Sequence, residues 1–193
     1  MAHSDKPAAT SPYELPPTPS RVNYSPIDAT LRFLLFSASV VSVVLMVTSK
    51  QSQLVPVPGL PFAVTIPAKF NHSPAFIYFI AALSVAGLYS IITILASLSS
   101  ISKAASSKTS LLLFAFGDVV MLGIVASATG ASGAVGYIGL KGNDHSGWAK
   151  ICDVYGKFCR HIGSATGVGL FAAVVLVFLS MLSTYSLYKR IRD

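Results

Sequence analysis

Charged side chains are scarce in this sequence. Lysine, arginine, aspartate and glutamate make up only 11% of its 193 residues, whereas soluble domains carry about 25%. The basic residues are scattered rather than interleaved with aromatic residues in a stripe, so we do not expect nucleic acid as a partner. The chain also has no phosphate-binding glycine loop, no HExxH motif and no nucleophile elbow. We therefore expect a protein that is not an enzyme, with no catalytic residue, cofactor or metal site.

Four long apolar stretches occupy most of the chain instead. Each is nearly free of charge, and a helix that spans a bilayer needs about 20 mostly apolar residues. One such run is compatible with the buried core of a soluble protein, but four runs separated by short polar loops are not. The stretches are Leu31–Ser49, Ser73–Ser100, Thr109–Tyr137 and Ile162–Tyr188.

This pattern predicts an all-α integral membrane protein, a four-transmembrane-helix bundle in a membrane domain of residues 29–188. We expect spans at about residues 29–49, 75–100, 109–134 and 163–188, with outer loops at 50–74 and 135–162. Several prolines exclude a regular helix from the first loop. Alternating apolar residues in Phe62–Ile66 predict a short strand there.

Both chain ends are polar. Residues 1–28 contain six prolines and cannot bury enough apolar surface to offset their ordering entropy, which predicts a disordered arm. Residues 189–193 form a short basic tail suited to anionic lipid headgroups. Because four spans return the chain to its starting side, both termini lie together, and the basic tail favours the cytoplasm.

The two cysteines, Cys152 and Cys159, both lie in the second outer loop. At this spacing they can close a small disulfide ring, which persists in an oxidising compartment. This reading places the loop outside and the termini in the cytoplasm. Two free thiols in a cytosolic loop are the first alternative. A metal site with His161 is the second, although it lacks a fourth ligand.

Arg32 and Asp118 are the charged residues inside the spans. Ionised groups in hydrocarbon usually face the bundle interior or one another. If the helices start near Ala29 and Ser110, the two residues differ in depth by roughly 7 Å, which an extended arginine can bridge. We expect a structural ion pair between spans one and three. The alternatives are an Arg32 that snorkels to the headgroups and an Asp118 that is protonated or bonded to serines.

Small residues recur every four positions in the third span, at Gly123, Ser127 and Ala131. Such a stripe lets helix backbones approach closely. At about 100° per residue it lies on the face opposite Asp118, so it points out of the bundle if the acid points in. We interpret it as a contact with a second copy; packing against a fourth helix or against lipid is the alternative.

These features together resemble the plant Casparian strip membrane domain protein-like (CASP-like) family. The resemblance rests on the intramembrane Arg32 and Asp118, on the cysteine loop Trp148–Cys159, and on the segment Pro67–Tyr78. It covers roughly Pro26 to the end of the chain.

The resemblance implies a multi-pass plasma-membrane protein that forms a homodimer or a higher homo-oligomer, and hetero-oligomers with related family members. It also implies that Arg32 and Asp118 are the family's intramembrane pair and that Cys152 and Cys159 are its outer-loop cysteines. Strip-forming relatives build an immobile membrane platform and recruit cell-wall enzymes. Leu60–Phe70 lacks the first-loop signature of that branch. We therefore expect a related non-enzymatic scaffold, with membrane lipids among its partners. The alternative function is a small transporter or channel subunit.

Overall fold

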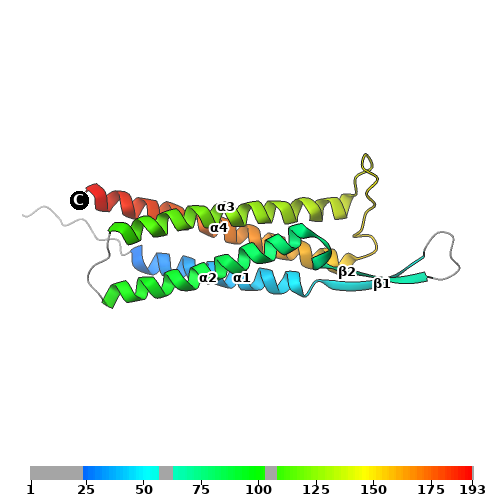
Figure 1. Ribbon diagram of the computed structural model, residues 1–193, viewed down its shortest axis with the longest axis horizontal. Coiled ribbons are helices and arrows are strands. Elements are labelled where there is room, and N and C mark those ends of the chain that lie inside the picture. Colours follow the sequence, from blue (N-terminus) through cyan, green and yellow to red (C-terminus); the bar gives the residue numbers. More distant parts are fainter. Residues whose placement is uncertain (1–23, 57–62, 103–107, 193) are drawn as a thin grey trace, which may run out of the picture.

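Four long helices run side by side along one axis in the computed structural model (Figure 1), which describes residues 24–56, 63–102 and 108–192. They are α1 (Tyr24–Val47), α2 (Pro74–Ser102), α3 (Lys108–Lys141) and α4 (Gly156–Arg192). Each contains a segment that is long and apolar enough to cross a membrane. This finding confirms the predicted four-helix membrane bundle.

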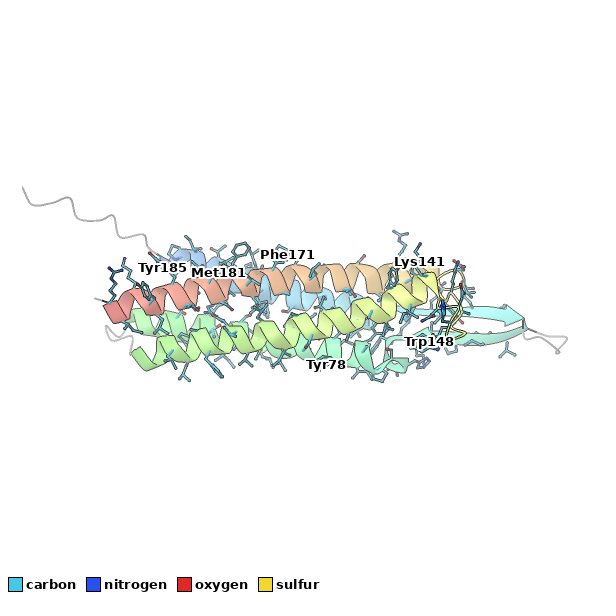
Figure 2. The ribbon with its side chains drawn as sticks, turned by 90° about the horizontal axis from the view of Figure 1, so that it is seen from above. Tyr78, Lys141, Trp148, Phe171, Met181 and Tyr185 are labelled. Carbon is cyan, nitrogen blue, oxygen red and sulfur yellow. A yellow bond between two sulfur atoms is a disulfide. The ribbon has the colours of Figure 1, made fainter. Side chains whose placement is uncertain are left out.

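The outside of the bundle is covered with apolar side chains. Phe33, Leu88, Phe116 and Phe178, one from each helix, are all exposed. Met181 likewise projects from α4 (Figure 2). Large apolar side chains exposed on every helix are costly in water but favourable against lipid chains, so the sides of the bundle are suited to a bilayer.

The order of the helices around the bundle positions the interior charges. Helix α1 packs against α2 and α4, and α3 packs against the same two helices. Helices α1 and α3 are therefore diagonal neighbours, and a contact between them must cross the centre of the bundle. The start of α1 and the end of α4 lie at one end, while the connection between α3 and α4 lies at the other (Figure 1).

A β-hairpin extends beyond the bundle from the end of α1 (Figure 1). Strands β1 (Lys50–Pro56) and β2 (Ala63–Lys69) are antiparallel, with Lys50 opposite Lys69 and Pro56 opposite Ala63. A short 3-10 helix, η1 (Phe70–His72), then leads into α2. The predicted strand at 62–66 is thus found in part, within β2, while Phe62 lies outside the described residues. The partner strand β1 was not predicted.

Helix α1 begins earlier than the sequence pattern predicts. Tyr24–Asp28 belong to this helix, although we expected them in the disordered arm. Pro26 is tolerated because the first turn of a helix has no intrahelical acceptor for its missing N–H. Asp28 pairs with Arg32 one turn later. Residues 1–23 of the expected arm lie outside the described residues.

The other helices also extend past the predicted spans. Helix α3 continues to Lys141 and ends at Gly142, whose φ of 71° suits glycine and whose N–H donates to the Ile138 carbonyl at 2.7 Å. Helix α4 starts at Gly156, so the second loop covers 142–155 rather than 135–162, and α4 also includes Lys189–Arg192 of the predicted tail. Hydropathy marks only the apolar part of a helix, whereas its hydrogen bonds continue into the headgroup region.

The core between α2 and α4 depends on one glycine. A Cβ atom at Gly169 would lie 2.7 Å from Cε2 of Phe79, which is closer than two carbons can approach. Phe79 is fully buried. The absence of a side chain at position 169 therefore creates the space for this ring.

Candidate functional site

Arg32 and Asp118 meet in the interior of the bundle. Nη1 of Arg32 lies 3.3 Å from Oδ1 of Asp118, and Nη2 lies 3.4 Å from Oδ2. The exposed fraction is 2% for the arginine and 0% for the aspartate. Because α1 and α3 are diagonal neighbours, this bidentate contact passes through the centre of the bundle. Arg32 does not snorkel away from Asp118 in this structure.

The axial offset between the two residues is small. Arg32 is eight positions after the start of α1, and Asp118 is ten positions after the start of α3. The expected offset of roughly 7 Å assumed that the two helices start at Ala29 and Ser110. The observed helices start earlier, at Tyr24 and Lys108. Counted from the observed starts, the offset is about 3 Å, well within reach of an arginine.

Two further side chains donate hydrogen bonds to Asp118. The Tyr89 hydroxyl, from α2, donates to Oδ1 at 2.7 Å. The Ser183 hydroxyl, from α4, donates to Oδ2 at 2.6 Å. The carboxylate therefore has partners on all three other helices, with each oxygen contacted by the guanidinium and by a hydroxyl. We call Arg32, Tyr89, Asp118 and Ser183 the central polar cluster.

Arg32 also contacts groups outside this cluster. Its Nε donates to Oδ2 of Asp28 at 2.8 Å, one helical turn earlier. Its Cζ lies 5.8 Å from the centre of the Phe114 ring, within the range of a cation–π contact. The guanidinium is thus placed between two carboxylates and against an aromatic ring.

Close packing brings Tyr89 to Asp118. A Cβ atom at Gly117 would lie 2.7 Å from the Tyr89 hydroxyl oxygen. A side chain at position 117 would therefore push the hydroxyl away. The glycine that precedes the aspartate makes room for one of its hydrogen-bond donors.

The chemistry of the central polar cluster favours holding helices together. Buried charges are tolerated when they are paired and hydrogen-bonded, and both oxygens of Asp118 have protein donors. A carboxylate in this state has little remaining capacity to accept a transported ion or a substrate proton. The arrangement is instead suited to fixing the relative positions of four helices.

The sequence offers only weak signals for Tyr89 and Ser183. A serine partner for Asp118 was one of the alternatives, and Ser183 is such a partner in addition to the ion pair. Tyr89 precedes residues 103–107 by nearly as much as Asp118 follows them. In an antiparallel helix pair such residues lie at similar depth. Which of the many hydroxyls at this depth faces the acid depends on helix rotation, and only the packed structure sets that.

The second loop is held by a disulfide between Cys152 and Cys159, whose Cα atoms are 5.6 Å apart. Cys152 lies in the loop and Cys159 in the first turns of α4. The structure therefore contains the predicted disulfide and not the two free thiols of the first alternative. Within the described ranges, no three His, Cys, Asp or Glu side chains are grouped to bind a metal.

Hydrogen bonds connect this loop to the rest of the hairpin end. The backbone N–H groups of Ile151 and Cys152 donate to the Gly139 carbonyl of α3, at 2.9 and 3.1 Å. The Tyr155 hydroxyl donates to the Ile66 carbonyl of β2 at 2.9 Å. In the first turn of α4, which follows the loop, the Phe158 N–H donates to the Gln51 side chain of β1 at 2.9 Å. The disulfide loop thus joins α3, α4 and the hairpin.

The predicted small-residue stripe is partly open. Gly123 is exposed, and a Cβ atom there would meet nothing within 4 Å. Ser127 is also exposed, but its hydroxyl is hydrogen-bonded to the Tyr78 hydroxyl of α2 at 2.8 Å, and Ala131 is half-buried. Gly130, which was not predicted, is as open as Gly123 and lies on the same face of the helix. The most accessible part of this face therefore runs from Gly123 to Gly130.

Comparison with known proteins identifies the family. The family described as the Casparian strip membrane protein domain matches residues 23–175. The chain belongs to this family. The match contains all four helices at least in part, together with the hairpin, the disulfide loop and three members of the central polar cluster; Ser183 lies beyond its end.

Curated relatives from several plants are similar to this CASP-like chain over nearly its whole length. CASP-like protein 1D1 of Populus trichocarpa is 58% identical over 194 residues, covering 99% of each chain. CASP-like protein 1D2 of Glycine max is 53% identical, again covering 99% of each chain. CASP-like protein Ni6 of Beta vulgaris subsp. maritima is 52% identical and covers 97% of this chain and 96% of its own. No solved structure matches the chain. The family is one of membrane proteins, and these names give no enzymatic activity.

Proposed function

We propose that this CASP-like protein is a non-enzymatic scaffold of the plasma membrane. In this proposal it associates with copies of itself and with related family members, organises a membrane domain, and recruits cell-wall-modifying proteins to it. The observation that carries the proposal is the match of residues 23–175 to the Casparian strip membrane protein domain. The missing strip-forming signature in 60–70 favours a membrane domain other than the Casparian strip itself.

The structure supports a scaffold more than the alternative of a small transporter. A transport pathway usually contains several membrane-embedded acids or histidines that change protonation. Here Asp118 accepts hydrogen bonds from three helices. Among the described residues, His72 and His145 lie outside the candidate spans, and His161 lies near the start of the fourth span.

The proposed orientation has both termini in the cytoplasm and the disulfide loop outside the cell. A disulfide persists in an oxidising compartment and is rare in the cytosol, which supports this direction. The hairpin and the disulfide loop lie at the same end of the bundle. Both would then face the cell wall, where a recruited partner would be found.

The proposed self-association uses the face of α3 that contains Gly123 and Gly130. Both positions are open to the outside, and small residues permit close helix contacts in lipid. The test is single-molecule counting of the tagged full-length protein in native nanodiscs. Gly123→Leu should shift the distribution toward single copies, while Gly167→Leu, an equally open position on α4, should leave it unchanged.

Mobility at the cell surface tests the organising role. Fluorescence recovery after photobleaching of the tagged protein should be slow and confined to patches, and it should accelerate in the Gly123→Leu variant. Free diffusion of the unmodified protein would contradict the scaffold. Ion or solute flux through reconstituted protein that disappears in Asp118→Asn would favour the transporter instead.

A further inference from the structure

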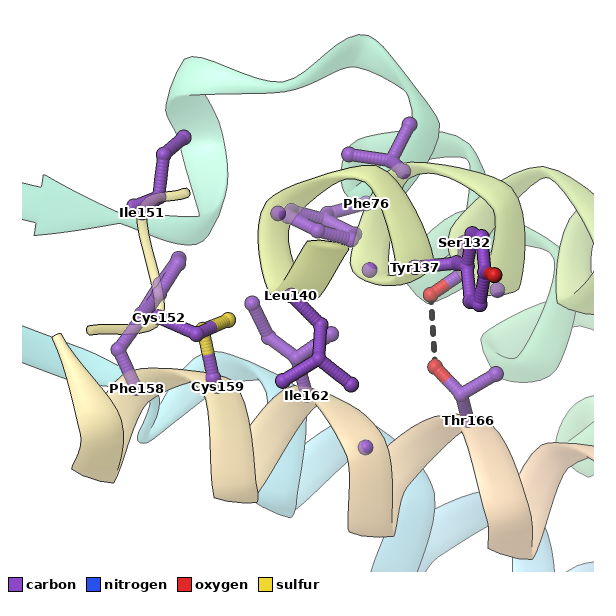
Figure 3. A pocket seen from close by; sticks show the side chains of 15 residues that line it. Phe76, Ser132, Tyr137, Leu140, Ile151, Cys152, Phe158, Cys159, Ile162 and Thr166 are labelled. Atoms are coloured by element: carbon purple, nitrogen blue, oxygen red, sulfur yellow. Dashed lines mark hydrogen bonds between the residues drawn. A yellow bond between two sulfur atoms is a disulfide. The ribbon is translucent and has the colours of Figure 1, made fainter. Parts of the chain in front are cut away.

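A cavity of about 360 Å³ lies between α3 and α4 at the hairpin end of the bundle (Figure 3). Its lining is mostly carbon, with the buried Phe76 of α2 on one side and the disulfide toward the loop. The hydroxyls of Ser132 and Thr166 pair with each other at 2.9 Å. This lining suits an apolar occupant, because its two deepest hydroxyls already satisfy one another.

Glycines line much of this space, and one of them faces open room. Four of its lining residues are glycines: Gly133, Gly136 and Gly139 on α3 and Gly163 on α4. A Cβ atom at Gly163 would meet nothing within 4 Å. The hollow at this point is therefore wide enough for a side chain that the sequence does not supply.

The cavity opens on the outside of the bundle. Three residues that line it are strongly exposed, with exposed fractions of 64% for Tyr137, 54% for Leu140 and 50% for Ile151. Exposed apolar surface on the side of a membrane bundle faces lipid chains. A second apolar hollow of about 400 Å³ shares Val135, Gly139 and Ile151 with the first and extends to Trp148.

The depth of the cavity matches one leaflet of a bilayer. Its α3 lining runs from Ser132 to Leu140 and stops just before Lys141. At about 1.5 Å per residue, Ser132 lies roughly 13 Å below Lys141, close to half of a hydrocarbon core of about 30 Å. Trp148, which is 57% exposed beside the same turn, is a residue type enriched at membrane interfaces.

The hairpin end of the bundle has more basic than acidic residues. The described basic residues there are Lys50, Lys69, Lys141, Lys150, Lys157 and Arg160, and the acidic ones are Asp144 and Asp153. This excess of positive charge complements the phosphate of a phospholipid. Arg160 is exposed and lies between two lining residues of α4, Cys159 and Gly163.

We propose that the cavity between α3 and α4 binds one acyl chain of a phospholipid from the leaflet at the hairpin end. The chain enters past Tyr137 and Leu140 and lies along the glycines, and its phosphate sits among the basic residues of the loop. The bound lipid covers the disulfide and fills the gap between the two helices. This inference depends on the membrane location of the chain and not on the scaffold proposal.

Photocrosslinking of the full-length protein tests this site. The protein is reconstituted in phosphatidylcholine nanodiscs that contain a trace of phosphatidylcholine with a diazirine near the end of one acyl chain. After irradiation, peptides are mapped by mass spectrometry. Labelling should concentrate in 132–140 and 158–166, and excess unlabelled phosphatidylcholine should compete with it.

Filling the cavity should remove the label. Gly163→Leu should lower labelling of these peptides by about tenfold, the factor expected when two methylene groups lose their buried site. Gly167→Leu is the matched control, because this position on the same helix is also open but does not line the cavity. If Gly163→Leu fails to form the disulfide, Gly163→Ala should still lower labelling by about fourfold.

Three outcomes would overturn the proposal. The first is labelling spread evenly over the exposed faces of all four helices. The second is an equal signal in the Gly163 and Gly167 variants. The third is displacement of the phospholipid by a photoreactive sterol that labels the same peptides, since the site would then belong to the sterol.

Discussion

The hydroxyl of Tyr89 lies 2.7 Å from Oδ1 of Asp118, the same oxygen that Nη1 of Arg32 contacts at 3.3 Å. A tyrosine of α2 therefore supports an ion pair formed by α1 and α3. Hydrogen bonds to charged groups are worth more than neutral ones, so this contact should be measurable on its own.

Tyr89→Phe should lower the free energy of unfolding by about 1.5–3 kcal/mol, because it removes a donor from a buried carboxylate. Thermal melting of the purified protein in detergent is the measurement. Tyr78→Phe is the control, because the Tyr78 hydroxyl is hydrogen-bonded to the exposed Ser127. Loss of that hydrogen bond should lower the free energy of unfolding by only about 0.6 kcal/mol. Equal losses in the two variants would show that Tyr89 does not support the ion pair.

Arg32→Gln should destabilise the bundle by about 3 kcal/mol, because it leaves the buried Asp118 carboxylate without its ionic partner. Asp118→Asn should cost less, because Arg32 keeps its contact with Asp28. The double variant replaces the ion pair with two amides and should be more stable than the sum of the single losses predicts. A double-mutant cycle in thermal melting should give a coupling of about 1–3 kcal/mol. Additive losses would contradict direct pairing.

Exchanging the charges should fail to restore stability. In the Arg32→Asp, Asp118→Arg variant, the new aspartate lies one turn from Asp28, and the new arginine faces the hydroxyls that now donate to Asp118. Repulsion between the two aspartates, and hydroxyl donors that face a guanidinium with no acceptor, replace the favourable contacts of the natural chain. A swapped variant that melts like the natural chain would show that the surroundings of the pair are unimportant.

Gly169→Ala should destabilise the protein by about 1–3 kcal/mol, the typical effect of an extra group in a packed core. The new Cβ atom would overlap the buried Phe79 ring. Gly167→Ala, two residues earlier and open, should be neutral or stabilising by up to about 1 kcal/mol. Adding Phe79→Leu should recover part of the loss at 169, and the absence of any recovery would contradict this clash as the cause.

Cysteine labelling tests the orientation in the membrane. On intact cells, a membrane-impermeant maleimide should label Cys152 and Cys159 only after treatment with an impermeant reductant, because the two sulfurs are bonded. A cysteine introduced as Arg192→Cys, at the opposite end of the bundle, should stay unlabelled until the cells are permeabilised. The reverse pattern would place the disulfide loop in the cytoplasm.

Individual elements show how far local sequence information extends. The four spans follow from apolar length alone, but the helix ends do not, because Lys141 and Gly156 extend α3 and α4 into polar sequence. The Phe62–Ile66 alternation indicates a strand, whereas its pairing with Lys50–Pro56 requires two distant segments to come into register. In the third span, the four-residue spacing of small residues identifies Gly123 as part of an open face. The hydrogen bond from Tyr78 to Ser127 on that face involves another helix, and the spacing does not predict it.

The sequence by itself determined that this chain has four membrane-spanning helices, two charges inside them and one pair of cysteines, because length, hydropathy and residue identity are properties of a linear string. The tertiary structure decided that α1 and α3 are diagonal, that Tyr89 and Ser183 complete the partners of Asp118, and that a cavity lined in part by glycines lies beside the disulfide. These features depend on how each helix is rotated and offset against its neighbours. Rotation and offset are set by packing across the bundle, which no local pattern encodes.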